Sequence, residues 1–132
     1  MAVVEATIGQ TPYAVTITVG PHGLISDEGP ALGGQGAGLA PFDLVLAGLG
    51  ACTAMTLKMY AERKSWPLLS ARVALNIAII RDGDGDALKI DRVLTLAGDL
   101  GEAQRARMAD IAERTPVTLL IKNGARIHTV LA

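Results

Sequence analysis

Few residues of this chain belong to types that perform chemistry, and the single cysteine, Cys52, is the main candidate nucleophile. The two histidines, His22 and His128, have no partners at the spacing of a Ser/His/Asp triad or a metal site, so a structural or exposed role is the simpler interpretation. Cys52 lies among small and apolar residues, where a lone cysteine is more often a packing residue than a reactive one. Composition alone leaves both interpretations of Cys52 open.

Two other motifs predict turns rather than binding sites. Asp82, Asp84 and Asp86 alternate as in a calcium loop, but no glutamate follows six residues later and the flanking segments are expected strands, so we predict a hairpin turn. Residues 29–40 are rich in glycine but lack both a Gly-Lys-Ser/Thr and a GxGxxG pattern, which favours a flexible connection over a phosphate loop. We therefore expect no metal site and no cofactor.

Length and composition predict one domain, residues 1–132, with enough hydrophobic material for a core. The net charge of −1 and the scarcity of aromatic residues disfavour a nucleic-acid-binding surface. A single cysteine forms no internal disulfide, and the N-terminus lacks the pattern of a secretion signal, so a cytoplasmic location is expected. All 12 basic residues follow position 57, so a cation in a site must come from the second half of the chain or from a partner subunit.

The segment 41–64 is predicted to be a long central helix. Pro41 suits a first helical turn, Asp43 lies near the positive end of the helix dipole, and no charge occurs between Asp43 and Lys58. That uncharged stretch is shorter than the roughly 20 apolar residues that span a bilayer, so we expect a buried core helix and no membrane. A stripe of small residues follows helical spacing: Ala47, Gly50, Ala51 and Ala54. The stripe could pack against a sheet or against a second copy of the helix, and both interpretations remain open.

Other elements follow from periodicity and turn residues. Alternation and turn signals predict strands at 3–8, 13–19, 24–26, 72–80, 90–97 and 126–131. A second helix is expected over 99–114, with Asp99 and Glu102 forming a capping box, a core stripe that ends at Thr115, and Pro116 stopping or redirecting the chain. Strand hairpins with helices set against them make an α+β domain.

Two segments resemble signatures of the OsmC/Ohr family, the osmotically induced and organic-hydroperoxide-resistance proteins. The first is DEGPALGGQGAGLAPFDLVLAGLGACTAMTLKMYAERKSWPL, residues 27–68, and the second is GDLGEAQRARMADIAERTPV, residues 98–117. The resemblance implies an OsmC-like fold, in which strand hairpins surround a long central helix and two chains form an intertwined homodimer.

The resemblance also implies a chemistry for Cys52, which occupies the position of the family's peroxidatic cysteine. Its thiolate would attack a small organic or lipid hydroperoxide, giving a sulfenic acid and an alcohol. Asp43 stands one residue after the position of a family glutamate, which here is Phe42, and is the second candidate catalytic residue.

This sequence departs from the family at the residues that support that chemistry. The second, resolving cysteine is replaced by Thr115, and the arginine of the first hairpin has no counterpart, with Gln10 near its place. Because a cation near a thiol favours the reactive thiolate, Arg114 and Lys122 are candidate substitutes. Two hypotheses follow: a one-cysteine peroxidase recycled by an external thiol reductant, or a non-catalytic protein that binds a small apolar ligand at the dimer interface.

Overall fold

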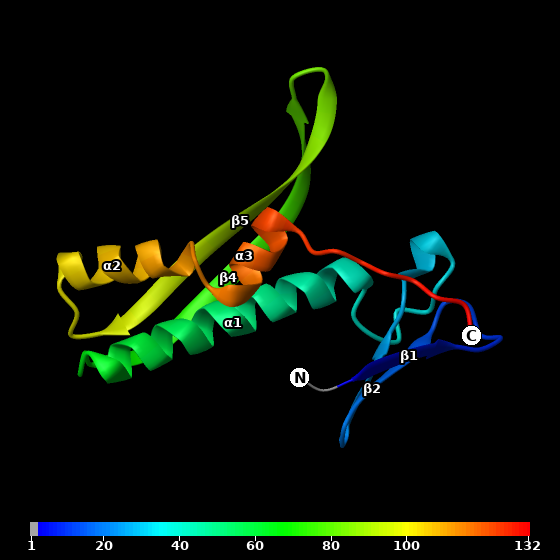
Figure 1. Cartoon of the computed structure of the whole chain (residues 1–132), viewed down its shortest axis with the longest axis horizontal. Coiled ribbons are helices and arrows are strands. Elements are labelled where there is room, and N and C mark those ends of the chain that lie inside the picture. Colours follow the sequence, from blue (N-terminus) through cyan, green and yellow to red (C-terminus); the bar gives the residue numbers. More distant parts are fainter. Residues whose placement is uncertain (1–2) are drawn as a thin grey trace. The chain divides into compact units, whose positions relative to one another are not determined.

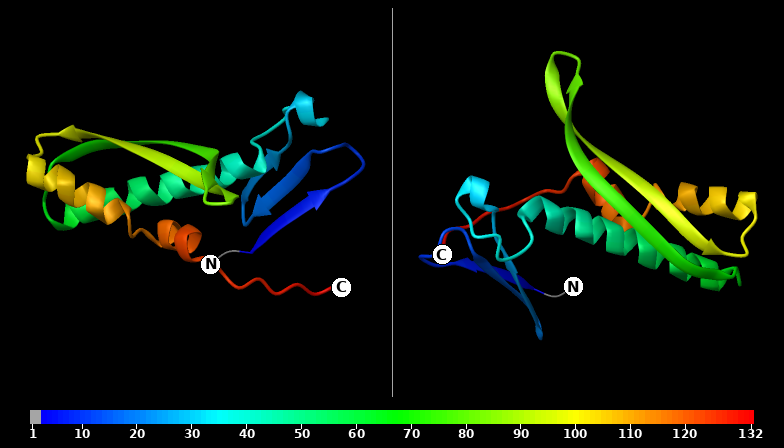
Figure 2. Two further views of the ribbon diagram at one scale, coloured as in Figure 1. Left: turned by 90° about the horizontal axis from the view of Figure 1, so that it is seen from above. Right: turned by 180° about the vertical axis from the view of Figure 1, so that it is seen from behind.

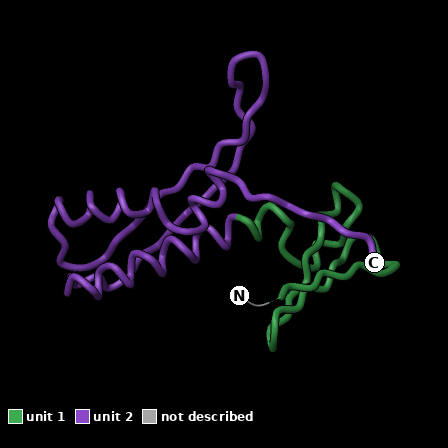
Figure 3. Tube along the Cα trace, viewed as in Figure 1, with its two compact units in different colours: residues 1–45 green, residues 46–132 purple. Residues whose placement is uncertain are grey.

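The computed structural model describes residues 3–132, and the chain divides into two compact units that meet between Val45 and Leu46 (Figure 3). The element order is three strands, a long helix, two long strands and two helices (Figure 1). The fold is mixed α+β, as predicted, and contains two antiparallel sheets.

The first unit is built on a three-stranded antiparallel sheet of β1 (Val4–Ile8), β2 (Val15–Val19) and β3 (His22–Ser26). β2 lies in the middle, with Val15 opposite Ile8 on one side and opposite Ser26 on the other. Its valines and isoleucine are half-buried and its threonines exposed, as strict alternation predicts for a strand with one covered face. All three predicted strands are confirmed, with ends shifted by at most two residues.

The glycine-rich segment after β3 is folded around a buried carboxylate. Asp27 accepts backbone hydrogen bonds from Glu28 at 2.8 Å and from Gln35 and Ala37, each at 3.1 Å. A short 3-10 turn, η1 (Pro30–Leu32), lies within it. A side chain at Gly38 would clash with the Ile25 carbonyl oxygen, so glycine is required there. The expectation of a flexible connection is therefore wrong: the glycines allow close backbone approach to an anchored loop.

The central helix, α1 (Pro41–Arg63), begins at the predicted proline and ends one residue before the predicted end. Leu49, Thr53, Leu57 and Ala61 recur every four residues and form its buried face. By length and composition alone this helix could cross a membrane, although the core helix of a soluble protein passes the same test. Only 22% of its most apolar window is buried within the single chain.

The second unit contains a long hairpin of β4 (Leu68–Asp82) and β5 (Gly85–Gly98). The helices α1 and α2 (Glu102–Ala112) run alongside this hairpin (Figure 2). Asp82 pairs with Gly85 across a tight turn in which Gly83 has a φ of 62°, so the predicted hairpin turn is confirmed. The core lies between the hairpin and the two helices. It contains Leu57, Ala61, Leu68, Leu100 and Met108.

The structure differs from the sequence predictions in the last third of the chain. α2 begins at Glu102 rather than at Asp99, because the Gly101 N–H donates to the Gln104 side chain at 2.8 Å and Gly101 is the N-cap. The expected capping box of Asp99 and Glu102 is therefore absent. A further helix, α3 (Pro116–Asn123), follows Pro116, which starts it rather than only ending α2.

The predicted strand at 126–131 is also absent: these residues have no regular secondary structure. Ile127, Val130 and Leu131 are exposed. A strand exists only when its backbone groups pair with a neighbour, and no described strand of this chain pairs with this segment.

Candidate functional site

Cys52 is a free, half-buried thiol in the middle of α1. Its neighbour Thr53 lies on the buried face of α1. Successive residues of a helix are rotated by about 100°, so the Cys52 side chain lies at the edge of that face. Gly50, two residues before Cys52, is covered by β4, because a Cβ there would lie 2.9 Å from Leu75 Cδ1. Part of the small-residue stripe therefore packs on the chain's own sheet, whereas Ala47 and Ala51 are exposed.

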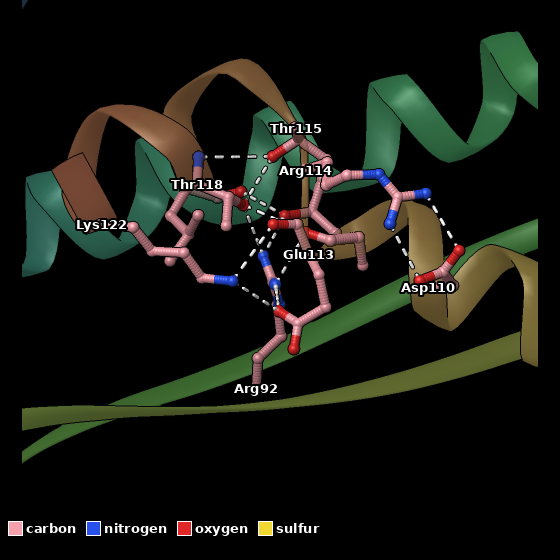
Figure 4. A network of polar contacts seen from close by, with 10 residues as sticks. Arg92, Asp110, Glu113, Arg114, Thr115, Thr118 and Lys122 are labelled. Carbon is pink, nitrogen blue, oxygen red and sulfur yellow. Dashed lines mark hydrogen bonds and ion pairs between the residues drawn. The ribbon is translucent and has the colours of Figure 1, made fainter.

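A guanidinium group reaches α1 at the residue after Cys52. Arg92 of β5 donates from Nη1 to Thr53 Oγ1 at 3.0 Å. It also donates from Nη1 to Thr118 Oγ1 at 2.9 Å (Figure 4). Its Nη2 donates to the Ala112 carbonyl at 2.7 Å and to Glu113 Oε2 at 3.1 Å. The side chain is only 13% exposed. One arginine thus links the helix of Cys52 to the corner between α2 and α3.

Arg92 was missed by sequence reasoning, although a signal was present. In the alternation of β5 it falls on the same face as Ile90, Leu94 and Leu96. A charged residue on an otherwise apolar strand face must find polar partners, and here those partners are two threonine hydroxyls, a carbonyl and a carboxylate.

Thr115, the predicted position of the missing resolving cysteine, is buried at this same corner. It is the N-cap of α3, and its Oγ1 lies 2.6 Å from Thr118 Oγ1. Thr118 in turn contacts Arg92, so a continuous chain of hydrogen bonds runs from Thr115 to Thr53, the residue after Cys52. The hydroxyl of Thr115 is therefore used in local structure.

The two predicted cations are each paired with a carboxylate at the surface. Arg114 makes two contacts of 2.9 Å with Asp110, which raise the pKa of Arg114 and lower the pKa of Asp110. Lys122 contacts the Glu113 carbonyl at 3.2 Å and its carboxylate at 3.3 Å. Within residues 3–132, neither cation makes a hydrogen bond to the Cys52 thiol.

Asp43, the second predicted catalytic residue, is exposed in the first turn of α1 and belongs to the first compact unit. Its carboxylate accepts from the Ala40 N–H at 3.3 Å, which is the geometry of a residue that satisfies a helix start. The structure thus gives Asp43 a local structural contact, and its role with Cys52 stays a prediction.

The family model described as OsmC-like protein matches residues 34–130. Solved structures give the same fold at low sequence identity. An OsmC-like protein from Mycoplasma pneumoniae is 17% identical, with a TM-score of 0.79, over 94% of this chain and 89% of that one. An organic hydroperoxide resistance protein OsmC from Legionella pneumophila is 19% identical, with a TM-score of 0.69, over 92% and 89%.

An organic hydroperoxide resistance protein from Elizabethkingia anophelis is 15% identical, with a TM-score of 0.70, over 94% of this chain and 89% of that one. A search of curated protein sequences gives no significant match. These structures share the fold, and the family match extends through Cys52, Arg92 and Thr115.

Proposed function

Because this chain belongs to the OsmC-like protein family, we propose that it acts on peroxides through Cys52, as a one-cysteine, thiol-dependent reductase of organic hydroperoxides. The observation that carries the proposal is the free, half-buried thiol at the middle of α1, the only cysteine in the chain. The names of the structural neighbours from Legionella and Elizabethkingia, both organic hydroperoxide resistance proteins, support the same class of substrate.

The proposed reaction balances with two equivalents of a thiol. The Cys52 thiolate attacks one oxygen of the hydroperoxide, an S–O bond forms, and the O–O bond breaks. Cys52 becomes a sulfenic acid, and the leaving alkoxide takes up a proton to become an alcohol. One external thiol then forms a mixed disulfide with Cys52 and releases water. A second thiol attacks that disulfide and regenerates Cys52.

An external reductant is required because the resolving position holds Thr115, whose hydroxyl cannot form a disulfide. Thr115 is tied to Thr118 at 2.6 Å and is buried, so this corner is built for packing and hydrogen bonding. We therefore expect oxidised Cys52 to persist when no thiol is supplied.

Treatment with cumene hydroperoxide followed by mass spectrometry tests the proposal. The wild-type protein should gain one oxygen at Cys52, trappable as a sulfenic acid, and further oxygens in excess peroxide. Cys52→Ser should gain none at this position, and consumption of peroxide with a small dithiol should cease. A wild-type Cys52 that stays a free thiol in excess hydroperoxide rules out the reductase.

One observation favours a second candidate function, a non-catalytic protein that binds a small apolar ligand where two copies meet. Arg114 and Lys122 each pair with a surface carboxylate, and within residues 3–132 neither makes a hydrogen bond to the Cys52 thiol. Binding of an apolar probe to Cys52→Ser with unchanged affinity, together with an inert wild-type thiol, would establish this function instead.

A further inference from the structure

A groove in the second unit has neither Cys52 nor Asp43 among its lining residues. It has a volume of about 790 Å³ and is formed by β5, α2, α3 and one residue of α1. Its apolar lining includes Leu49, Leu88, Ile90, Leu94, Ala109 and Ile121. A volume of this size is in the range of small-molecule sites, and an aliphatic lining suits a hydrocarbon chain.

Two cations of the groove lining converge on one carboxylate. Arg92 Nη2 lies 3.1 Å and Lys122 Nζ 3.3 Å from the same oxygen, Glu113 Oε2. The other charged residue of the lining, Asp91, is paired with Lys89 at 3.1 Å. Arg92 and Lys122 carry two positive charges and Glu113 carries one negative charge, so the cluster has a net charge of +1. This part of the groove therefore favours one further negative charge.

The two cations differ in how firmly they are held. The Arg92 side chain is 13% exposed and fixed by Thr53, Thr118 and the Ala112 carbonyl, so its guanidinium keeps its position whether or not Glu113 is present. Lys122 and Glu113 are 51% and 59% exposed and can move at low cost. The position of the Glu113 carboxylate therefore fits a carboxylate group, and a ligand carboxylate can displace that of Glu113.

We propose that this groove binds a monocarboxylate with an aliphatic chain, such as a fatty acid, with its carboxylate on Arg92 and Lys122 and its chain along the apolar lining. The charge-assisted contacts fix the head group, and the chain contributes through burial of apolar surface. The inference is independent of peroxide chemistry, because no step of it involves Cys52.

Isothermal titration calorimetry with dodecanoate below its micelle concentration tests the inference, with dodecan-1-ol as the uncharged control. Dodecanoate should bind at one site per chain and at least tenfold more tightly than the alcohol. Octanoate, which is four methylenes shorter, should bind at least tenfold more weakly than dodecanoate, because each buried methylene adds affinity. Equal affinity for the acid and the alcohol, or no binding of dodecanoate, overturns the proposal; the latter result is expected if a second copy fills the groove.

Substitutions at the head-group end make the test specific. Lys122→Gln should weaken dodecanoate severalfold and leave dodecan-1-ol unchanged, whereas Lys122→Arg should retain most of the affinity. Glu113→Gln should tighten binding, because it removes the internal competitor. Lys64→Gln, directly after the C-terminal end of α1, makes the same change in net charge and should have no effect. An unchanged affinity in Lys122→Gln contradicts the assignment.

Cys52→Ser separates this inference from the proposed function. It should bind dodecanoate as the wild type does, while losing all reaction with hydroperoxide. Circular dichroism of every variant establishes that a loss of binding does not come from a loss of folding. A loss of dodecanoate binding in folded Cys52→Ser would place the ligand at the thiol and overturn the separate site.

Discussion

Arg92 holds three elements together through one guanidinium group, because β5 presents it to α1 and to the corner between α2 and α3. A buried charge is costly unless its hydrogen-bonding capacity is used, and here four contacts between 2.7 and 3.1 Å use it. Thr53 also donates to the Leu49 carbonyl at 2.7 Å, so the contact fixes one face of the helix that carries Cys52.

Arg92→Met should destabilise the fold by about 3 kcal/mol, because Ala112 O and the hydroxyls of Thr53 and Thr118 lose a charged donor in a buried place. Urea unfolding followed by circular dichroism measures the change. The control is Arg81→Met at the hairpin tip, where a 75% exposed side chain pairs with Asp86 at 3.6 Å and about 0–0.5 kcal/mol is expected. Equal effects of the two variants would mean that the buried network contributes nothing beyond a surface ion pair.

Thr115→Cys tests whether the position is that of a resolving cysteine. After peroxide treatment the variant should form an intrachain disulfide with Cys52 and gain turnover with a dithiol, provided that the Cα atoms can approach to roughly 4.4–6.8 Å. Non-reducing mass spectrometry after proteolysis detects the bond. The variant should also lose about 0.5–2 kcal/mol of stability, because Thr115 caps α3.

Thr115→Ser is the matched control for this substitution. Serine keeps the capping hydroxyl and supplies no thiol, so it should unfold close to the wild type and form no disulfide. If folded Thr115→Cys leaves both thiols unpaired after oxidation, Thr115 and Cys52 do not meet and the site assignment is wrong.

At the scale of elements, the loop that follows β3 depends on the ionised carboxylate of Asp27. Its pKa lies below the ordinary 3.8, chiefly because the Ala37 N–H donates to it, with further hydrogen bonds from Gln35 and Glu28. Burial opposes this shift without reversing it. The folded state therefore holds its proton less tightly than the unfolded state does.

Because the pKa of Asp27 is lower in the folded state, the ionised carboxylate stabilises the fold fully at pH values above 3.8, the ordinary pKa. This stabilisation is lost as the pH falls from 3.8 toward the pKa of the folded state. The wild-type free energy of unfolding should thus drop between about pH 5 and pH 3. Asp27→Asn should be less stable at pH 7 and show a shallower drop. Asp84→Asn, in the exposed hairpin turn, should follow the wild-type curve; if Asp27→Asn also follows it, the loop does not depend on the charge.

Short sequence patterns predict most of the strands and helices, because each pattern has one physical cause. Alternation in β2, β4 and β5 reflects one covered face, and the proline and charge positions of α1 mark its ends. The short helix α3 was missed, although Thr115 as its N-cap and Pro116 in its first turn are helix-start signals that the sequence contains. Segment 126–131 has the alternation of a strand, but alternation does not specify a partner.

The candidate site was predictable to a similar extent. Cys52 and Thr115 follow from the resemblance to the family signatures, and the structure ties Thr115 by hydrogen bonds to the residue after Cys52. Arg92 could not be assigned from spacing, because its partners are separated from it by 39, 26 and 20 positions along the chain. Such long-range contacts depend on how the hairpin folds over the helices.

At the scale of the whole molecule, α1 is apolar on most sides and is covered on few of them. Met55 and Met59 are each 60% exposed, and Ala47, Gly48 and Ala51 are exposed along the same length of helix. A large exposed apolar surface on a helix generally marks a contact with another molecule. The family resemblance and this surface support the proposal that two copies of the chain meet along α1.

Sedimentation equilibrium at micromolar concentration should therefore show a dimer for the wild type. Ala51→Leu should raise the dissociation constant roughly 5- to 150-fold, equivalent to about 1–3 kcal/mol, because leucine overpacks a contact made by small residues. Ala51 is exposed in the single chain, so the substitution leaves the chain's own core unchanged. Ala103→Leu makes the same change at an exposed position of α2 and should leave the dimer intact. A wild-type monomer, or equal weakening by both leucines, would show that α1 is not the surface through which two copies associate.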